Sequence, residues 1–256
     1  KSFSNISGSI GLAAQATDKL NFKLNIARGF RAPSIPELAS NGAHEGTNRY
    51  EYGDAGLKSE TSLQFDGGFD YSAEHLSIGI SSFYNRFSNF IFYSKLEAAG
   101  GGDSLVNVNG DIIPAFKFNQ RKASLAGFEA KLDIHPHPLD WLHIENSFSF
   151  VSGRFAAVLD GSKNIPFIPA PKLVTELRSN FDHLKGAVHN FYIKLELDNT
   201  FTQRNVFTAY DTETKTKGYS LLNLGVGADF VNKKEQALFS LSLSALNITD
   251  VAYQNH

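Results

Sequence analysis

The most regular feature of this chain is an alternation of apolar and polar residues at every second position. In one segment Phe191, Ile193 and Leu195 alternate with Tyr192 and Lys194. Side chains two residues apart lie on the same face of a β-strand, so each such segment predicts a strand with one apolar and one polar face. Ten segments follow this pattern, at 4–16, 20–31, 60–71, 76–93, 115–134, 141–152, 172–181, 189–201, 218–230 and 237–249.

The charged residues of these segments keep to one face. No charge interrupts the apolar rows, although Arg28 and Arg86 share the apolar parity just beyond them. A Lys or Arg at the midplane of a bilayer costs ~2–4 kcal/mol, so such an apolar face suits lipid. The charges of the opposite parity are Asp66, Asp70, Glu129, Lys131, Asp133, Glu145, Glu176, Arg178 and Asp229.

The connections between the segments alternate between short and long. The long ones cover 32–59, 94–114, 153–171 and 202–217. Short periplasmic turns and long extracellular loops are typical of outer-membrane barrels. A soluble sandwich would instead pack its apolar face on a second sheet. The pattern therefore predicts an all-β fold, a transmembrane antiparallel β-barrel with apolar residues facing lipid and polar residues facing the lumen.

Length and composition limit the number of domains and the kinds of site that the chain can have. The 256 residues are expected to form one barrel domain, 1–256, and the net charge of −2 gives no electrostatic argument for nucleic-acid binding. The chain has no cysteine, which excludes disulfides, thiolate metal sites and a cysteine nucleophile. The sequence has no run of about 18 apolar residues, so no transmembrane helix is predicted.

The direction of the strands predicts a partial barrel. If short turns are periplasmic, the first strand runs toward the periplasm and the tenth runs away from it, so both chain ends lie outside the cell. An open sheet would leave edge strands unpaired in lipid. We therefore expect about ten strands of a larger barrel, with earlier strands before Lys1 and at least one more after His256.

Five motifs point to a known family. They are RGFRAPSIPEL (28–38), GDAGLKSETS (53–62), LAGFEAKLDIHPHPLDWL (125–142), IPFIPAPKL (165–173) and ALNITDVAYQNH (245–256). Together, and in this order, they resemble the signature segments of TonB-dependent outer-membrane receptors. Each motif is weak alone, but the five cover essentially the whole chain.

The resemblance implies more than the pattern does. The family has a twenty-two-stranded barrel with an N-terminal plug, and this chain resembles its C-terminal part, without the plug, the TonB box and the last strand. It implies an outer-membrane receptor that takes up a scarce nutrient, an iron complex (siderophore or haem) or another metal. The implied partners are TonB and its inner-membrane energising complex through the absent plug, outer-membrane lipid and lipopolysaccharide, and a metal chelate or metal ligand. No cofactor, nucleic-acid partner or enzymatic activity is expected.

The 32–59 loop holds the candidate ligand-binding residues His44, Glu45, Arg49, Tyr50, Glu51 and Asp54. This mixture suits an anionic metal chelate, and His44 with Glu45 suits direct metal binding. Arg28 and Arg31 flank the outer rim, where a planar guanidinium matches carboxylate or catecholate oxygens. The alternatives are a solvated loop whose Asn and Gly serve turns, and arginines paired with lumen carboxylates or lipid phosphates.

A second group of imidazoles falls in a predicted periplasmic turn. His135, His137 and His143 lie within nine residues, which suits a metal site. The prolines at 136 and 138 favour a rigid short connection instead. Trp141 follows at the predicted bilayer boundary, where it would act as an interfacial anchor.

Three rival functions remain open. A passive porin shares the alternation but needs no plug. An outer-membrane enzyme would need a catalytic group at the rim or lumen, and no triad is marked in the sequence. A soluble all-β binding module would stay monodisperse without detergent.

Overall fold

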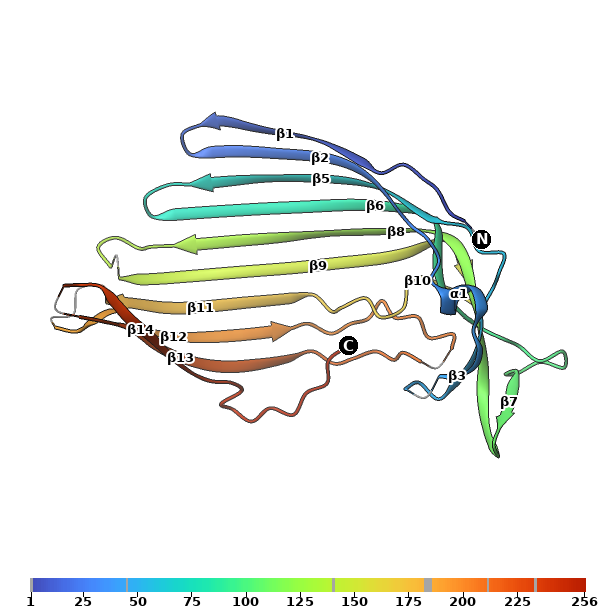
Figure 1. The fold of residues 1–256 in the computed structure, drawn as a ribbon. Coiled ribbons are helices and arrows are strands. Elements are labelled where there is room, and N and C mark those ends of the chain that lie inside the picture. The colour runs from blue at the N-terminus through green and yellow to red at the C-terminus, as the bar shows by residue number, and fades with distance from the viewer. Residues whose placement is uncertain (1, 45, 140, 182–185, 211, 233) are drawn as a thin grey trace.

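The computed structural model describes residues 2–44, 46–139, 141–181, 186–210, 212–232 and 234–256. It contains one long curved sheet. Its ten main strands are antiparallel, and each pairs with the next of the ten (Figure 1). All ten predicted strands are present, which confirms the partial antiparallel barrel; among the described residues the sheet does not close between its first and last strands. In sheet order they are β1 (Gly8–Thr17), β2 (Leu20–Arg31), β5 (Glu60–Ser72), β6 (Leu76–Lys95), β8 (Asp111–Ile134), β9 (Leu142–Leu159), β11 (Lys172–Phe181), β12 (Val188–Thr200), β13 (Tyr219–Val231) and β14 (Ala237–Ala245).

The strand register places the apolar rows on one face. Ile26 of β2 is paired with Phe65 of β5, and Leu195 of β12 is paired with Leu177 of β11. These rows are not covered by another layer of protein: Leu12 is 64% exposed and Leu243 is also 64% exposed. The structure therefore excludes the sandwich arrangement, and the outward face is a continuous apolar surface.

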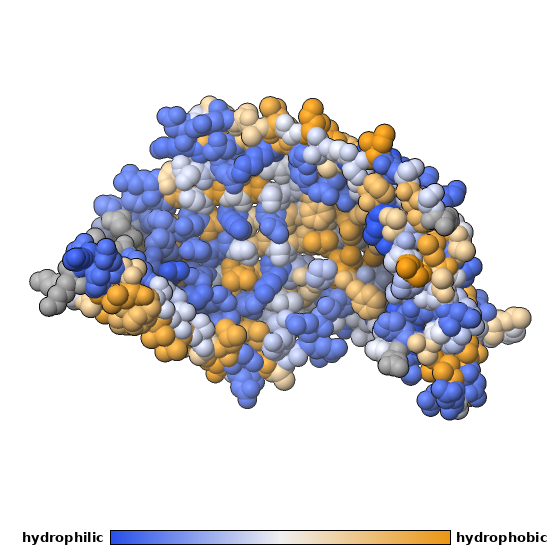
Figure 2. Space-filling model, in the orientation of Figure 1, coloured by the Kyte–Doolittle hydropathy of each residue, from blue (hydrophilic) through white to orange (hydrophobic). Residues whose placement is uncertain are grey.

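The opposite, inward face is polar near the short turns. Lys23 forms an ion pair with Asp70 across two strands, with 2.6 Å between Nζ and Oδ2. Farther round the sheet Lys194 lies 2.7 Å from Glu176. Figure 2 shows hydrophilic side chains gathered on the wall of the hollow at the end that carries the short turns, and hydrophobic ones toward the opposite end. We call these two ends the short-turn end and the long-loop end.

The strands differ from the predicted ones mainly at the long-loop end. The first strand begins at Gly8 rather than at residue 4. In contrast, β6, β8 and β9 extend two, four and seven residues into the predicted loops. The register between β6 and β8 shifts between Phe87 and Phe90, and Asn89 has a φ of 59°. The shift moves the later side chains of β6 to the other face, so the apolar row changes parity there while the strand continues.

The long connections also contain short elements that alternation does not predict. They are α1 (Ile35–Ala39), β3 (Asn41–His44), β4 (Arg49–Tyr52), β7 (Leu105–Val108) and β10 (Ser162–Asn164). Ser34 caps α1 in a capping box with Glu37, and Pro36 lies in its first turn, where its missing N–H costs nothing. Among the described residues, no helix has the length and apolar character needed to cross a bilayer.

At the long-loop end, the ends of β6, β8 and β9 pack with the long connections into one unit, which we call the outer lobe. Its core is aromatic: Phe155 of β9 is 1% exposed, and Phe207 of the 202–217 connection is fully buried. The ring of Phe155 lies 4.8 Å from that of Phe92, and the ring of Phe207 lies 4.8 Å from that of Tyr210. These contacts fix the 202–217 connection against the inward face of the sheet.

Candidate ligand-binding site at the long-loop end

A groove of about 560 Å³ opens beside the 32–59 connection. Two of the predicted ligand-binding residues, His44 and Glu51, line it. Its other lining residues are Ser34, Pro36, Glu37, Ser40, Asn41, Gly42, Ala43, Tyr93 and Phe118. The groove therefore combines an imidazole, carboxylates and aromatic rings at the end of the sheet where the long connections gather (Figure 1).

The groove is built on a hairpin that is fixed to the sheet. β3 and β4 pair with each other. β4 also pairs in parallel with the first part of β8, with Tyr50 opposite Ala115 and Tyr52 opposite Lys117. Beneath the hairpin, Leu57 and Phe118 pack together in a small buried cluster. Backbone pairing on one side and apolar packing below make this connection a defined surface.

Arg49 and Glu51 are paired with each other within this surface. Arg49 donates from Nε to Glu51 Oε1 at 2.8 Å, and its guanidinium carbon lies 3.8 Å from the centre of the Tyr93 ring. The Glu51 side chain is 6% exposed and that of Arg49 is 15% exposed. Both charges thus have a partner within the chain.

Arg31 holds α1 in place. Its Nη1 donates to both carboxylate oxygens of Glu37, at 2.9 and 2.8 Å, and its Nη2 lies 3.5 Å from Glu60. Burial opposes ionisation of Glu37, but the hydrogen bonds from Arg31 and from the backbone N–H of Ser34 outweigh it and lower the pKa of Glu37. Arg31 is still 46% exposed at the rim.

The remaining loop candidates differ in what they contact. His44 is exposed at the end of β3, where Nδ1 shares a hydrogen bond with Thr47 at 3.2 Å. Tyr50 donates to Asn41 Oδ1 at 3.0 Å. Asp54 accepts from the N–H of Gly56 and lies 3.4 Å from Lys117 Nζ. Glu45 lies outside the described residues.

Arg28 and Arg31 do not share a face. They are three positions apart in one strand, so their side chains leave opposite sides of the sheet. Arg28 is exposed, and its Nη1 donates to the carbonyl oxygen of Ile6 at 2.5 Å. The structure therefore brings Arg31 to the inward rim and places Arg28 on the apolar outward face, away from the groove.

The groove suits a chelate better than a bare ion. Among the described residues, His44 belongs to no group of three metal-ligating side chains. An exposed imidazole beside aromatic rings can instead contact the oxygen-rich and aromatic surface of a bound complex.

Several residues of the outer lobe were not predicted as part of the site. Tyr93 and Phe118 lie on β6 and β8 beyond the register shift, with ring centres 4.5 Å apart. Tyr210 donates to Asp160 Oδ2 at 2.8 Å, and burial, together with this bond, raises the pKa of Tyr210 to about 12. The run Phe90–Tyr93 is the sequence signal for this packing, since four consecutive bulky residues at the end of a strand leave neither face polar.

A family model described as "TonB dependent receptor-like, beta-barrel" matches residues 1–248. The chain belongs to this family. The ferric enterobactin receptor of Pseudomonas aeruginosa is 30% identical over 162 residues, which are 57% of this chain and 20% of that protein. The chain thus spans about a fifth of this curated relative.

Solved structures show the same fold for this TonB-dependent receptor barrel. Copper transporter OprC superposes with a TM-score of 0.73 at 17% identity, over 98% of this chain and 34% of that one. The siderophore receptor PirA from Acinetobacter baumannii gives a TM-score of 0.61 at 17% identity, over 96% of this chain and 37% of that one. These superpositions confirm the fold, and the family model over residues 1–248 confirms the family resemblance drawn from the five motifs.

Two signature segments of this TonB-dependent receptor contact each other. The N–H of Gly53 donates to the carbonyl of Ser40 at 2.7 Å, and that of Asp54 donates to Glu37 at 2.8 Å. A Cβ at Gly53 would lie 2.4 Å from the backbone nitrogen of Ala39, so glycine is required here. RGFRAPSIPEL and GDAGLKSETS therefore form one structural unit at the base of the groove.

Proposed function

We propose that this chain is the ligand-facing part of an outer-membrane receptor that takes up an iron chelate in a Gram-negative bacterium. The observation that carries the proposal is the fixed groove at the long-loop end of a TonB-dependent receptor barrel. Family membership supports the receptor class, and the exposed apolar rows support a position in lipid. The long-loop end is then extracellular.

In this mechanism the barrel binds and guides but performs no covalent chemistry. The outer loops capture the chelate, and the polar inward face lines an aqueous path. A plug coupled to TonB and the inner-membrane energising complex would open that path. Outer-membrane lipid and lipopolysaccharide would contact the outward face, where Arg28 can reach phosphate oxygens.

The chemistry of the chain favours a chelate bound through oxygens and rings over a soft metal ion. Copper(I) prefers thiolate and thioether ligands, and this chain contains neither cysteine nor methionine. Iron(III) chelates carry negative charge, which Arg31 at the rim can attract before binding. The ligand class proposed here is therefore an anionic iron complex of the siderophore type.

Energised uptake tests the receptor class against a porin. Cells that express the full-length receptor are given a radioiron-labelled catecholate chelate, with and without an uncoupler. The proposal expects accumulation to stop when the proton-motive force is collapsed. Accumulation that continues at the same rate would identify a passive channel.

The contribution of the 32–59 loop to chelate binding is tested by changing His44 and Glu45. The double variant His44→Ala with Glu45→Ala is expected to bind the chelate about tenfold more weakly, as for loss of one or two polar contacts. The matched control is Glu74→Ala with His75→Ala, an adjacent Glu–His pair at the short-turn end. Equal affinity of all three proteins in a fluorescence-quenching titration would remove the loop from the site.

A further inference from the structure

We propose that Asp133, His135 and His143 bind a divalent transition-metal ion, of the Zn²⁺ class, at the short-turn end of the inward face. The three residues lie at the end of β8 and the start of β9, and one ligand atom from each lies within 4.8 Å of the others. This site is distinct from the groove, which lies at the opposite end of the sheet (Figure 1). Its chemistry, two imidazoles and one carboxylate, is a recurrent ligand set for such ions.

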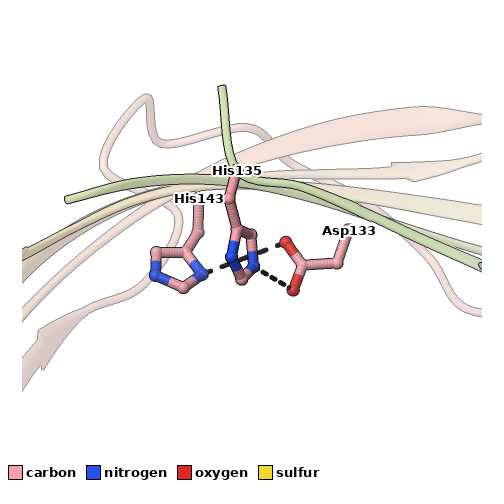
Figure 3. Close-up of side chains that lie close together, drawn as sticks. All are labelled: Asp133, His135 and His143. Carbon is pink, nitrogen blue, oxygen red and sulfur yellow. Dashed lines mark hydrogen bonds and ion pairs between the residues drawn. The ribbon is translucent and has the colours of Figure 1, made fainter. Parts of the chain in front are cut away.

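The strand pairing brings these residues together. Ile134 is paired with Ile144, so Asp133 and His143 fall on the same, inward face of adjacent strands. His135 follows directly after β8, where its N–H donates to the carbonyl of His75 at 3.0 Å. Figure 3 shows both imidazole rings turned toward the carboxylate of Asp133.

The prolines make this arrangement rigid. The N–H of Leu139 donates to the carbonyl of Pro136 at 2.6 Å, and the N–H of Leu142 donates to Leu139 at 2.8 Å. Because proline fixes its own backbone angle, the turn varies little and the two histidines stay opposite each other. The rigid connection predicted from the sequence and a metal site are therefore compatible, since the first supports the second.

Within the part of the chain that the structure describes, one of the two carboxylate oxygens of Asp133 has no hydrogen-bond partner. His135 Nε2 lies 2.7 Å from Asp133 Oδ2, a normal hydrogen-bond distance. Oδ1 is buried and has no hydrogen-bond partner among the described residues; His143 Nδ1 lies 3.9 Å away. A buried acceptor without a partner costs free energy that a bound cation would recover. This unpartnered oxygen is aimed at the space between the three side chains.

The geometry needs a small contraction to hold an ion. Ligand atoms about 2.1 Å from a tetrahedral Zn²⁺ stand about 3.4 Å apart, so a pair that lies up to 4.8 Å apart must close by about 1.4 Å. Rotation of the partly exposed side chains can provide this, since Asp133 and His135 are each 30% exposed and His143 is 20% exposed. The same exposure gives an ion access from the solvent.

Cobalt titration of the purified full-length receptor tests the site, because Co²⁺ reports its ligands through visible absorption and is displaced by Zn²⁺. We expect one Co²⁺ that is lost on addition of Zn²⁺. His143→Ala is expected to weaken it by about tenfold or more, since loss of even an outer-shell partner of a metal site costs ~10–100-fold. Asp133→Asn, which preserves side-chain size, is expected to do the same.

The control is His189→Ala, which removes a histidine paired in register with Asp229 on β13 but not part of the cluster. It should leave the cobalt spectrum and affinity unchanged. Heat-modified mobility on gels checks that each variant forms its barrel, and Asp133→Asn serves if His143→Ala does not. Absence of Zn²⁺-displaceable Co²⁺ in the unmodified receptor, or equal affinity in folded cluster variants and control, would overturn the proposal.

Discussion

The outer lobe and the rest of the sheet, from the short turns up to the lobe, are stabilised in different ways. We call the second region the spanning part. In the spanning part the outward side chains are exposed, as Leu24 is at 60%, and the inward ones form ion pairs along the wall. In the outer lobe Phe155 and Phe207 are buried in a core like that of a water-soluble protein. In the proposed outer-membrane position, lipid would cover the outward face of the spanning part, whereas the lobe has its own hydrophobic core.

The largest effect should come from the core of the lobe. Phe207→Ala removes a fully buried ring and should cost about 3–5 kcal/mol of local stability. We expect the 202–217 connection to be cleaved much faster by protease while the barrel remains folded. Phe201→Ala is the matched control, because that ring is 46% exposed. Equal cleavage of both variants would show that the lobe has no core of its own.

The outward face should show the next largest effect. Leu241→Arg places a charge in the apolar row of β14 and should cost ~2–4 kcal/mol in a bilayer. Ser242→Arg, one residue later on the inward face, should cost little because that side chain faces water. Refolding into lipid vesicles, followed by denaturant titration, measures both. Similar losses for the two variants would contradict the assignment of faces.

A smaller effect is expected at Tyr210. Tyr210→Phe removes the hydrogen bond to Asp160 and should loosen the same connection by about 1 kcal/mol. The raised pKa, about 12, predicts that this contribution is complete below pH 10 and is lost as the pH rises through 12. Hydrogen exchange of the 202–217 connection measures the first effect. A spectrophotometric tyrosinate titration of the two proteins measures the second.

The smallest effect is a pH dependence of α1. Because the pKa of Glu37 is lowered by folding, its stabilisation is present above its ordinary value of 4.5 and is lost as the pH falls through the lower, folded value. With Arg31 46% exposed, solvent screening limits the contribution to below about 1 kcal/mol. The protection factors of the amides in 34–40, which correct for intrinsic exchange at each pH, should fall on acidification, and Glu37→Gln should abolish that fall. An identical acid response in the variant would assign it to another group.

The sequence predicted the spanning part well and the outer lobe poorly. Alternation locates strands wherever one face meets lipid and the other meets water, as in β2 and β12. Beyond Phe87 the predicted strand 76–93 does continue, but the register shift changes which side chains share a face, and both faces pack against protein. The short strand β4 depends on pairing with residues more than sixty positions away, which no local pattern encodes.

The candidate residues show the same limit. Their location in one loop followed from the sequence, but their partners did not. Arg49 and Glu51 were predicted as ligand contacts, and the structure shows them paired with each other. The group Asp133, His135 and His143 was only partly visible, because Asp133 comes together with the histidines through the pairing of two strands.

The parallel pairing of β4 with β8 has a consequence for recognition. A binding surface that hydrogen-bonds to a barrel strand before the ligand arrives is preorganised, so little conformational entropy is lost on association. In the proposed receptor, selectivity near His44 would then depend on how well a chelate fits a fixed groove, rather than on a loop that folds over the ligand.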